Sequence, residues 1–107
     1  MAQTFPVLSR LYAIPNGAYL ARGAAGYFAL ASAGLKKGVP DMCLPVARKG
    51  YHSLYIELKT ETGKLSDDQR RWLSELRGDG NYSVVCVGSE SAIECLTWYL
   101  SEEKDNE

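Results

Sequence analysis

The sequence predicts an α/β fold in which helices cover the faces of a mixed sheet. Two short stretches, residues 53–58 and Tyr82–Val87, have the length and the β-branched and aromatic content of strands. Longer segments with apolar residues at helical spacing begin near Ser66 and Ser89. Because such segments alternate along the chain, we expect the order strand, helix, strand, strand, helix, strand, helix.

The first third of the chain predicts one extended segment and one helix. The apolar run at residues 8–14 ends at the turn signal Pro15-Asn16-Gly17, which is typical of a strand that closes into a loop. The alanine-rich residues 18–33 predict a helix that packs closely against a neighbour. Its two interior glycines weaken it, because each costs about 1 kcal/mol relative to alanine.

A turn and a hairpin are predicted next. Gly34 and Gly38 break the chain before residues 39–44, which we interpret as a turn that enters a strand. The loop at residues 45–51 makes this strand and residues 53–58 the two arms of a hairpin. Because side chains alternate along a strand, one face of the second arm carries Leu54, Ile56 and Leu58, and the other carries Tyr55, Glu57 and Lys59.

The last third predicts a helix, a strand and a second helix. Ser66 starts the first helix, which ends near Gly78. Tyr82–Val87 predicts a buried strand. Ser89 is expected to cap the final helix, whose apolar face carries Ile93, Leu96 and Leu100.

Composition indicates one domain in a reducing compartment. At 107 residues and 46% hydrophobic content, the chain can bury one core, so we assign residues 1–101 to one domain and residues 102–107 to a disordered acidic tail. The three cysteines cannot all pair within the chain and lack metal-ligand spacing, which predicts free thiols in the core. Without a signal sequence or a run near the roughly twenty apolar residues of a membrane span, we expect a soluble cytoplasmic protein.

Charge is distributed unevenly along the chain. The net charge of −1 argues against a protein that coats nucleic acid through a basic excess. Residues 1–64 nevertheless hold eight Lys or Arg against three Asp or Glu, whereas residues 65–107 hold four against ten. A basic front is compatible with a polyanion bound on one face, and ordinary solvated surface explains the same pattern.

Two carboxylates and a lysine form the candidate site. Glu57 and Lys59 project from one face of the predicted strand, and alone they are explained by a weak surface ion pair. Asp41 lies sixteen residues earlier, at the mouth of the adjoining strand, where a hairpin can bring the two carboxylates together. Such a pair is an oxygen-rich site for Mg²⁺ or Mn²⁺, ions that activate water and neutralise charge on a phosphate. The lysine ammonium can stabilise the transition state electrostatically.

Four stretches, in order, resemble one nuclease family. They read IPNG at residues 14–17, KGVPD at 37–41, YHSLYIELKT at 51–60 and GKLSDDQ at 63–69, the last followed by Trp72 and Leu73. From about Tyr12 to Leu100 the chain resembles the virus-type replication-repair nuclease (VRR-NUC) domain, a branch of the PD-(D/E)xK superfamily. The resemblance implies a restriction-endonuclease-like core and a metal-dependent DNA endonuclease. It also implies Asp41 and Glu57 as ligands of Mg²⁺ or Mn²⁺, and Lys59 as the catalytic lysine.

Gln69 has two explanations. In the family pattern a glutamine on the helix after the lysine strand supports the site, which implies a catalytic role for Gln69. Ser66 and Gln69 also match a capping box, which alone accounts for both residue types. The sole histidine, His52, is interpreted as a solvated loop residue rather than a general base. Trp72 and Trp98 are interpreted as core or interface residues.

The resemblance further implies a substrate and an assembly. Members of this phage-associated branch are similar to Holliday-junction resolvases, so we expect branched DNA as substrate, in a bacterial or phage-infected cell. Paired cuts in a two-fold junction favour a homodimer, with residues 18–33 and the last helix, through Trp98 and Tyr99, as candidate interfaces. We expect DNA contacts from six basic residues and one turn residue: Arg22, Lys36, Lys37, Arg48, Lys49, Lys64 and Asn16. The turn alone also explains Asn16.

One departure from the family supports an alternative function. The family pattern normally begins with a helix that carries a further metal-site glutamate, whereas residues 1–40 contain no Asp or Glu. The alternative is a catalytically weak DNA-binding module or nuclease subunit that keeps the fold. A third interpretation, a small interaction domain with surface ion pairs, has no sequence feature in its favour.

Overall fold

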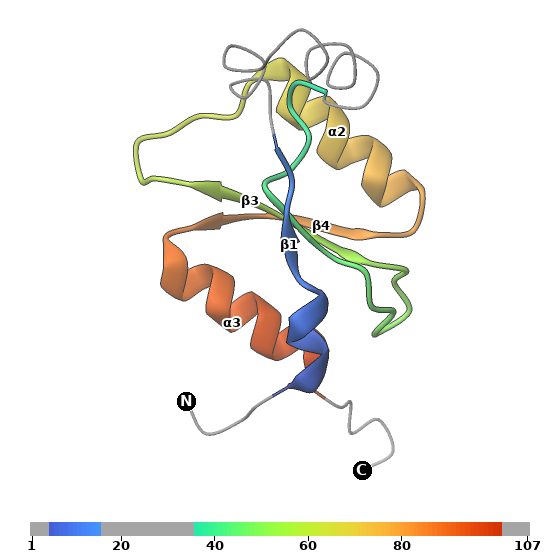
Figure 1. Ribbon diagram of the computed structural model, residues 1–107. Coiled ribbons are helices and arrows are strands. Elements are labelled where there is room, and N and C mark those ends of the chain that lie inside the picture. The colour runs from blue at the N-terminus through green and yellow to red at the C-terminus, as the bar shows by residue number, and fades with distance from the viewer. Residues whose placement is uncertain (1–4, 16–35, 102–107) are drawn as a thin grey trace, which may run out of the picture.

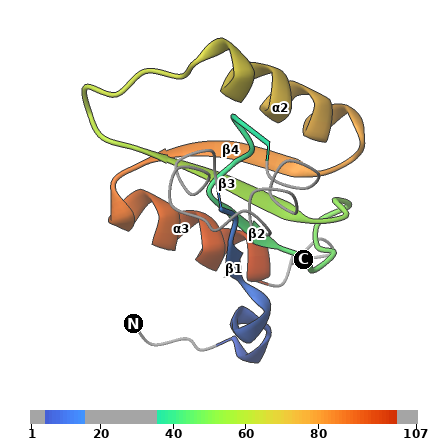
Figure 2. The same ribbon diagram turned by 45° about the horizontal axis from the view of Figure 1, so that its top comes forward.

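The computed structural model describes residues 5–15 and 36–101 of the chain. Four strands form one mixed sheet in the order β1-β2-β3-β4 (Figures 1 and 2). β2 is antiparallel to both β1 and β3, whereas β3 and β4 run parallel. The strands are β1 (Tyr12–Ala13), β2 (Met42–Leu44), β3 (Leu54–Lys59) and β4 (Tyr82–Val87). The predicted helix at residues 18–33, the Asn16-Gly17 turn and the tail at 102–107 lie outside the described residues.

One helix covers each face of the sheet. α2 (Asp67–Gly78) connects the parallel strands β3 and β4 and lies on one face, and α3 (Ser89–Leu100) lies on the opposite face (Figures 1 and 2). A helix in this connection is expected, because parallel neighbours cannot be joined by a tight turn. The predicted α/β architecture, a mixed sheet flanked by helices, is therefore confirmed. No helix within the described residues is long and apolar enough to cross a membrane.

The predicted hairpin joins β2 to β3 through a tight turn. Arg48 and Tyr51 exchange backbone hydrogen bonds of 3.2 and 2.8 Å across it. The two residues between them, Lys49 and Gly50, have φ angles of 53° and 86°. Positive φ at both central positions matches the right-handed twist of the flanking strands, and glycine accepts it without steric cost.

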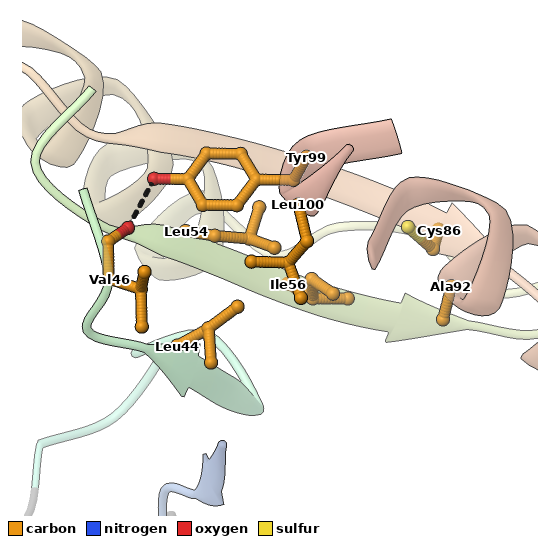
Figure 3. Close-up of a cluster of buried hydrophobic side chains, with 8 residues drawn as sticks. All are labelled: Leu44, Val46, Leu54, Ile56, Cys86, Ala92, Tyr99 and Leu100. Atoms are coloured by element: carbon orange, nitrogen blue, oxygen red, sulfur yellow. Dashed lines mark hydrogen bonds between the residues drawn. The ribbon is translucent and has the colours of Figure 1, made fainter. Parts of the chain in front are cut away.

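The apolar core lies between the sheet and α3. Leu54 and Ile56 of β3 point into it, as the predicted alternation requires, and they are 0% and 1% exposed. Tyr99 of α3 is fully buried, and its hydroxyl donates a 2.7 Å hydrogen bond to the carbonyl of Val46 (Figure 3). The buried cluster comprises Leu44, Val46, Leu54, Ile56, Cys86, Ala92, Tyr99 and Leu100. Cys43 and Cys86 are buried free thiols, as predicted, and the Cys95 thiol is free and half-buried.

The segment before β1 differs from the prediction. Instead of one extended run over residues 8–14, the chain forms a 3₁₀ helix at Pro6–Arg10 and only a two-residue strand at Tyr12–Ala13. Pro6 favours this helix, because its fixed φ suits the first turn and its missing N–H needs no partner there. The turn packs Val7 and Leu8 against the core cluster. The beginning of the apolar run therefore belongs to a helical turn, and its strand is limited to Tyr12–Ala13.

The last helix corrects three details of the prediction. Its N-cap is Gly88, and Ser89 is its first residue. Ile93 was expected on the apolar face but is 52% exposed, because Ala92, Tyr99 and Leu100 occupy the buried side. Tyr99, predicted as a dimer contact, is fully buried in the core and therefore cannot contact a second subunit. Trp98 beside it is 45% exposed and remains available.

Candidate active site

Asp41 is held at the point where β2 enters the sheet. It directly precedes β2, and its Oδ2 accepts a 2.7 Å hydrogen bond from the backbone N–H of Leu58. The carboxylate thus continues the β2–β3 pairing one step past the last backbone partners, Met42 and Ile56. This contact fixes the Asp41 side chain across the end of β3, beside the strand residues on either side of Leu58.

Glu57 is the central buried carboxylate. It projects from the α2 face of β3 and is only 2% exposed. Its Oε2 accepts a 3.0 Å hydrogen bond from Nε2 of Gln69 and lies 3.7 Å from Nζ of Lys59. Its Oε1 is buried without a hydrogen-bond partner. The carboxylate therefore has one oxygen fixed by the protein and one left free.

The electrostatics of Glu57 leave its negative charge undercompensated. Burial, and after it the nearby charge of Asp41, raise the pKa of Glu57 from 4.5 to about 7, against the lowering effect of Lys59. Two neighbouring carboxylates that raise a pKa in this way favour binding of a cation, which stabilises both charged forms. The free Oε1 supplies an unused ligand atom. These residues fit a divalent ion, which proteins commonly hold through one or two carboxylates and substrate phosphates.

Lys59 shares the α2 face of β3 with Glu57, as predicted from the alternation. Its side chain is 18% exposed, so the ammonium remains partly accessible. Gly63, in the loop that leads to α2, packs beside its stem, since a Cβ at position 63 would lie 3.4 Å from Cδ of Lys59. The loop therefore confines the stem of the lysine.

Gln69 joins the start of α2 to the site. Ser66 Oγ accepts a 3.1 Å bond from the Gln69 N–H, and the Ser66 N–H donates a 2.9 Å bond to Gln69 Oε1. These contacts form the predicted capping box. The amide nitrogen of the same side chain contacts Glu57. The two explanations offered by the sequence are therefore not exclusive.

Gly38, which the sequence indicated only as a break, packs against α2. Its φ of +91° is in the region that favours glycine. A Cβ at this position would lie 2.6 Å from Cβ and 2.7 Å from the carbonyl carbon of Asp68. The turn that leads to Asp41 is thereby docked on the first turn of α2. In the sequence, the signal for such a contact is a glycine in a short turn that leads to a candidate metal ligand.

The predicted DNA-contacting residues lie in separate places. Lys36 and Lys37 are exposed next to Gly38, and Lys64 is exposed in the loop before α2, so these three flank the first turn of α2. Arg48 and Lys49 lie in the β2–β3 turn, at the opposite end of the hairpin from Asp41. Lys49 Nζ donates a 2.8 Å bond to the carbonyl of Ser101 and lies 5.1 Å from the centre of the Trp98 ring. Asn16 and Arg22 lie outside the described residues.

His52 is also remote from the carboxylates. It precedes β3, whereas Glu57 and Lys59 lie toward the other end of that strand. Its backbone N–H donates a 2.9 Å bond to Gly80, and its ring packs so closely there that a Cβ at position 80 would lie 2.7 Å from the imidazole. Within the described residues, no group of three or more His, Cys, Asp or Glu side chains is placed to hold a metal ion. The acidic site there consists of Asp41 and Glu57.

Comparisons with known proteins agree with this arrangement. The model of the VRR-NUC domain family matches residues 8–90, which is most of the chain. A solved structure described as a VRR_NUC domain protein superposes with a TM-score of 0.74 at 24% sequence identity, over 92% of this chain and 76% of that one, and shows that the fold is shared. No curated protein matches the chain. The extent of the family match shows that the chain belongs to the VRR-NUC domain family, a family of nucleases.

Proposed function

We propose that this VRR-NUC chain is a Mg²⁺- or Mn²⁺-dependent endonuclease that hydrolyses phosphodiester bonds in DNA. The observation that carries the proposal is the buried carboxylate of Glu57, which lies near Asp41 and Lys59 and whose Oε1 has no hydrogen-bond partner. Burial of a carboxylate in this state lowers stability, so a binding role explains its presence better than a structural one. The family supplies the reaction class, and the side chains supply the assignment of roles.

Asp41 and Glu57 would hold the ion. When bound, the ion supplies the Lewis acid that activates a water molecule and neutralises charge developing on the phosphate. The Leu58 N–H orients the Asp41 carboxylate, and Gln69 holds one oxygen of the Glu57 carboxylate while the other has no partner in the protein. Both ligands are therefore fixed before an ion arrives, which reduces the cost of ordering them.

Lys59 is the catalytic lysine of the proposal. Its ammonium lies 3.7 Å from Glu57 and keeps partial access to solvent. A fixed positive charge at this place stabilises negative charge on the scissile phosphate more in the transition state than in the ground state. Gln69 acts through Glu57 rather than on the phosphate. Loss of Lys59 should therefore reduce the rate, whereas loss of Glu57 should remove the ion.

The substrate of the proposal is branched DNA, with a four-way junction first. Paired cuts need two sites related by two-fold symmetry, which a homodimer supplies. The exposed Trp98 is one side chain available for such an interface. The carboxylate end of the molecule is the side that carries Asp41, Glu57 and the first turn of α2. It is flanked by Lys36, Lys37 and Lys64, which would contact phosphates on either side of the cut.

A second candidate function is a DNA-binding module or nuclease subunit with little cleavage of its own. The sequence favours it in one respect, because residues 1–40 contain no acid to serve as a further metal ligand. The two candidates share the fold and the DNA ligand. They differ in whether the pure chain cleaves DNA.

The test compares the wild type with Glu57→Gln on linear, flap and four-way-junction DNA, with and without Mn²⁺. If the chain is an endonuclease, we expect the wild type to cleave only with Mn²⁺ and to prefer the junction, and Glu57→Gln not to cleave. Junction binding without cleavage in any condition would favour the second candidate. Neither binding nor cleavage would overturn both.

A further inference from the structure

A chain of three hydrogen bonds connects the beginning of α2 to the buried carboxylate. Ser66 Oγ accepts from the Gln69 N–H at 3.1 Å, and the Ser66 N–H donates to Gln69 Oε1 at 2.9 Å. Gln69 Nε2 then donates to Glu57 Oε2 at 3.0 Å. Ser66 thus contacts Glu57 only through one side chain, that of Gln69.

The chemistry of an amide makes this arrangement directional. The oxygen of Gln69 can only accept, and its NH₂ group can only donate. If the amide were reversed, its oxygen would face the Glu57 carboxylate and its NH₂ group would face the Ser66 N–H, so both contacts would become repulsive. The Ser66 N–H therefore selects the orientation in which Gln69 donates to Glu57.

The cap also restricts a flexible side chain. Gln69 has three rotatable side-chain bonds, and a side chain of this kind loses considerable entropy when it is held in one conformation. The bonds to Ser66 hold the backbone and the amide oxygen of Gln69 together, so the amide nitrogen is already placed for Glu57. Part of the entropy that Gln69 loses in contacting Glu57 is therefore already lost in forming the cap.

A second contact fixes the same turn relative to the other acid. Asp68 lies between Ser66 and Gln69 in the sequence, and its Cβ and carbonyl carbon lie 2.6 and 2.7 Å from the position that a Cβ of Gly38 would take. Gly38 belongs to the turn that leads to Asp41. The first turn of α2 therefore touches the segments that carry both carboxylates.

We propose that Ser66 is a positioning residue of the metal site, which acts through Gln69 to hold Glu57 with its unpartnered Oε1 turned to a divalent ion. The inference rests on the proposed function for the identity of the ligand. Ser66 has an ordinary structural role as a helix cap, so the test must separate that role from positioning.

The experiment measures Mn²⁺ affinity by calorimetry, without DNA, for the wild type, Ser66→Ala, Ser66→Thr, Gln69→Ala and the double variant Ser66→Ala/Gln69→Ala. Ser66→Ala keeps the backbone N–H that selects the amide orientation and removes the hydroxyl that holds the Gln69 backbone. Contacts that orient metal ligands typically change affinity by about 10–100-fold when removed, so we expect this variant to weaken Mn²⁺ binding about tenfold, the low end of that range. Ser66→Thr keeps the hydroxyl and should bind within about twofold of the wild type. Glu75→Gly, at an exposed position in the last turns of α2, is the matched control, because it weakens the helix away from the site.

The double variant gives the sharpest result. If Ser66 acts through Gln69, the loss of Mn²⁺ affinity from Ser66→Ala should vanish in the Gln69→Ala background. The loss of helix stability should persist there, because residue 69 still needs an acceptor for its backbone N–H. Unchanged affinity in Ser66→Ala, an equal loss in Glu75→Gly, or additive losses in the double variant would each overturn the positioning role.

The side-chain amide of Gln69 supplies a readout that needs neither ion nor DNA. Its NH₂ resonances, identified by their absence from Gln69→Ala, should move in Ser66→Ala and return toward the wild-type positions in Ser66→Thr. An amide signal unmoved by Ser66→Ala would overturn the inference. The coupling between Ser66, Gln69 and Mn²⁺ does not require DNA cleavage, so failure of the endonuclease proposal is distinguishable from failure of this one.

Discussion

The two faces of β3 bury adjacent residues for different reasons. Ile56 points toward α3, is 1% exposed and packs among apolar side chains. Glu57 points toward α2, is 2% exposed and keeps one carboxylate oxygen without a partner. Burial of Ile56 stabilises the fold, whereas burial of an undercompensated carboxylate opposes it. The same degree of burial therefore stabilises the fold at Ile56 and destabilises it at Glu57.

The two faces also differ in how they satisfy their buried polar groups. The α3 face satisfies its buried polar group, since the Tyr99 hydroxyl donates to Val46. The α2 face leaves Glu57 Oε1 unpaired and holds Asp41 close enough to raise the pKa of Glu57. Departures from local consistency of this kind are expected at functional sites.

The largest effects are expected on activity from the α2 face. Glu57→Gln should lose Mn²⁺ binding and cleavage together, because it removes a negatively charged ligand. Lys59→Ala should keep Mn²⁺ and DNA binding but lower the cleavage rate by roughly a hundredfold or more, the scale of one lost transition-state contact. Calorimetry and single-turnover cleavage of a four-way junction separate the two outcomes.

Ile56→Val, one residue away on the α3 face, is the control for this comparison. It should cost about 0.5–1.5 kcal/mol of stability and leave the cleavage rate unchanged. If Lys59→Ala cleaved at the wild-type rate under saturating Mn²⁺, the Glu57–Lys59 pair would be an ion pair without a catalytic role.

The next effect is a pH dependence of stability that belongs to Glu57. Its pKa in the folded chain is raised to about 7 from 4.5, so between these values the folded protein keeps a proton that the unfolded chain releases. The contribution of Glu57 to the free energy of unfolding is therefore fully present below pH 4.5, falls as the pH rises through this window, and is lost above pH 7. The loss is at most roughly 3 kcal/mol.

Urea unfolding of the metal-free protein at pH 5 and pH 8 measures this loss. Glu57→Gln cannot ionise and should lose less stability than the wild type between the two pH values. Saturating Mn²⁺ should restore stability more at pH 8 than at pH 5, because protons compete with the ion for the carboxylate. Parallel pH profiles for wild type and variant would show that Glu57 is not the group responsible.

A smaller effect is expected from the polar contact on the α3 face. Tyr99→Phe removes the donor to the Val46 carbonyl and leaves that group unpaired inside the core, which costs about 1–3 kcal/mol. Cleavage should be unchanged, because the contact lies on the face away from Glu57. Tyr12→Phe, at a residue 52% exposed, should be nearly neutral in the same unfolding measurement. A loss of activity without a loss of stability in Tyr99→Phe would contradict the separation of the two faces.

Local patterns made much of this fold predictable. The period-two alternation of residues 53–58 predicted which residues of β3 face α3, and the Ser66–Gln69 box marked the start of α2 correctly. The extended run predicted at residues 8–14 was wrong in its first half and right at Tyr12–Ala13, because apolar residues alone do not distinguish a strand from a short helical turn after Pro6. Ile93 was misplaced for a related reason, since a residue at the edge of an apolar stripe can face solvent.

The sequence predicted the residues of the site and the hairpin that brings Asp41 and Glu57 together, but not the contacts that hold them. Asp41, Glu57 and Lys59 were identified by residue type and spacing, and their roles remain predictions. The partner of Asp41 is a backbone N–H, which has no side-chain signature. Gln69 serves the cap and Glu57 together, and only the packing of α2 on the sheet makes both contacts possible. Lys49 similarly binds the end of α3, 52 residues away in sequence.

The placement of the basic residues gives the last and smallest predicted effect, on DNA binding. Lys36 and Lys37 lie next to Gly38, which packs on the first turn of α2, whereas Arg48 and Lys49 lie at the far end of the hairpin. Lys49 also gives one of its donors to the Ser101 carbonyl. We therefore expect the first pair to contact phosphates near the cut and the second pair to contribute less.

Salt dependence of junction binding measures this difference, with all proteins in the Lys59→Ala background to suppress cleavage. Each lost phosphate contact reduces the slope of log affinity against log salt by about 0.9, so Lys36→Glu/Lys37→Glu should reduce it by roughly 2. Arg48→Glu/Lys49→Glu makes the same change in net charge and is the matched control, with a slope expected near that of the parent. Because both double variants alter the overall charge equally, a general electrostatic effect would lower both slopes alike. Equal slopes in the two variants would therefore mean that DNA does not distinguish the two ends of the hairpin, and the carboxylate end would lose its assignment as the DNA-binding side.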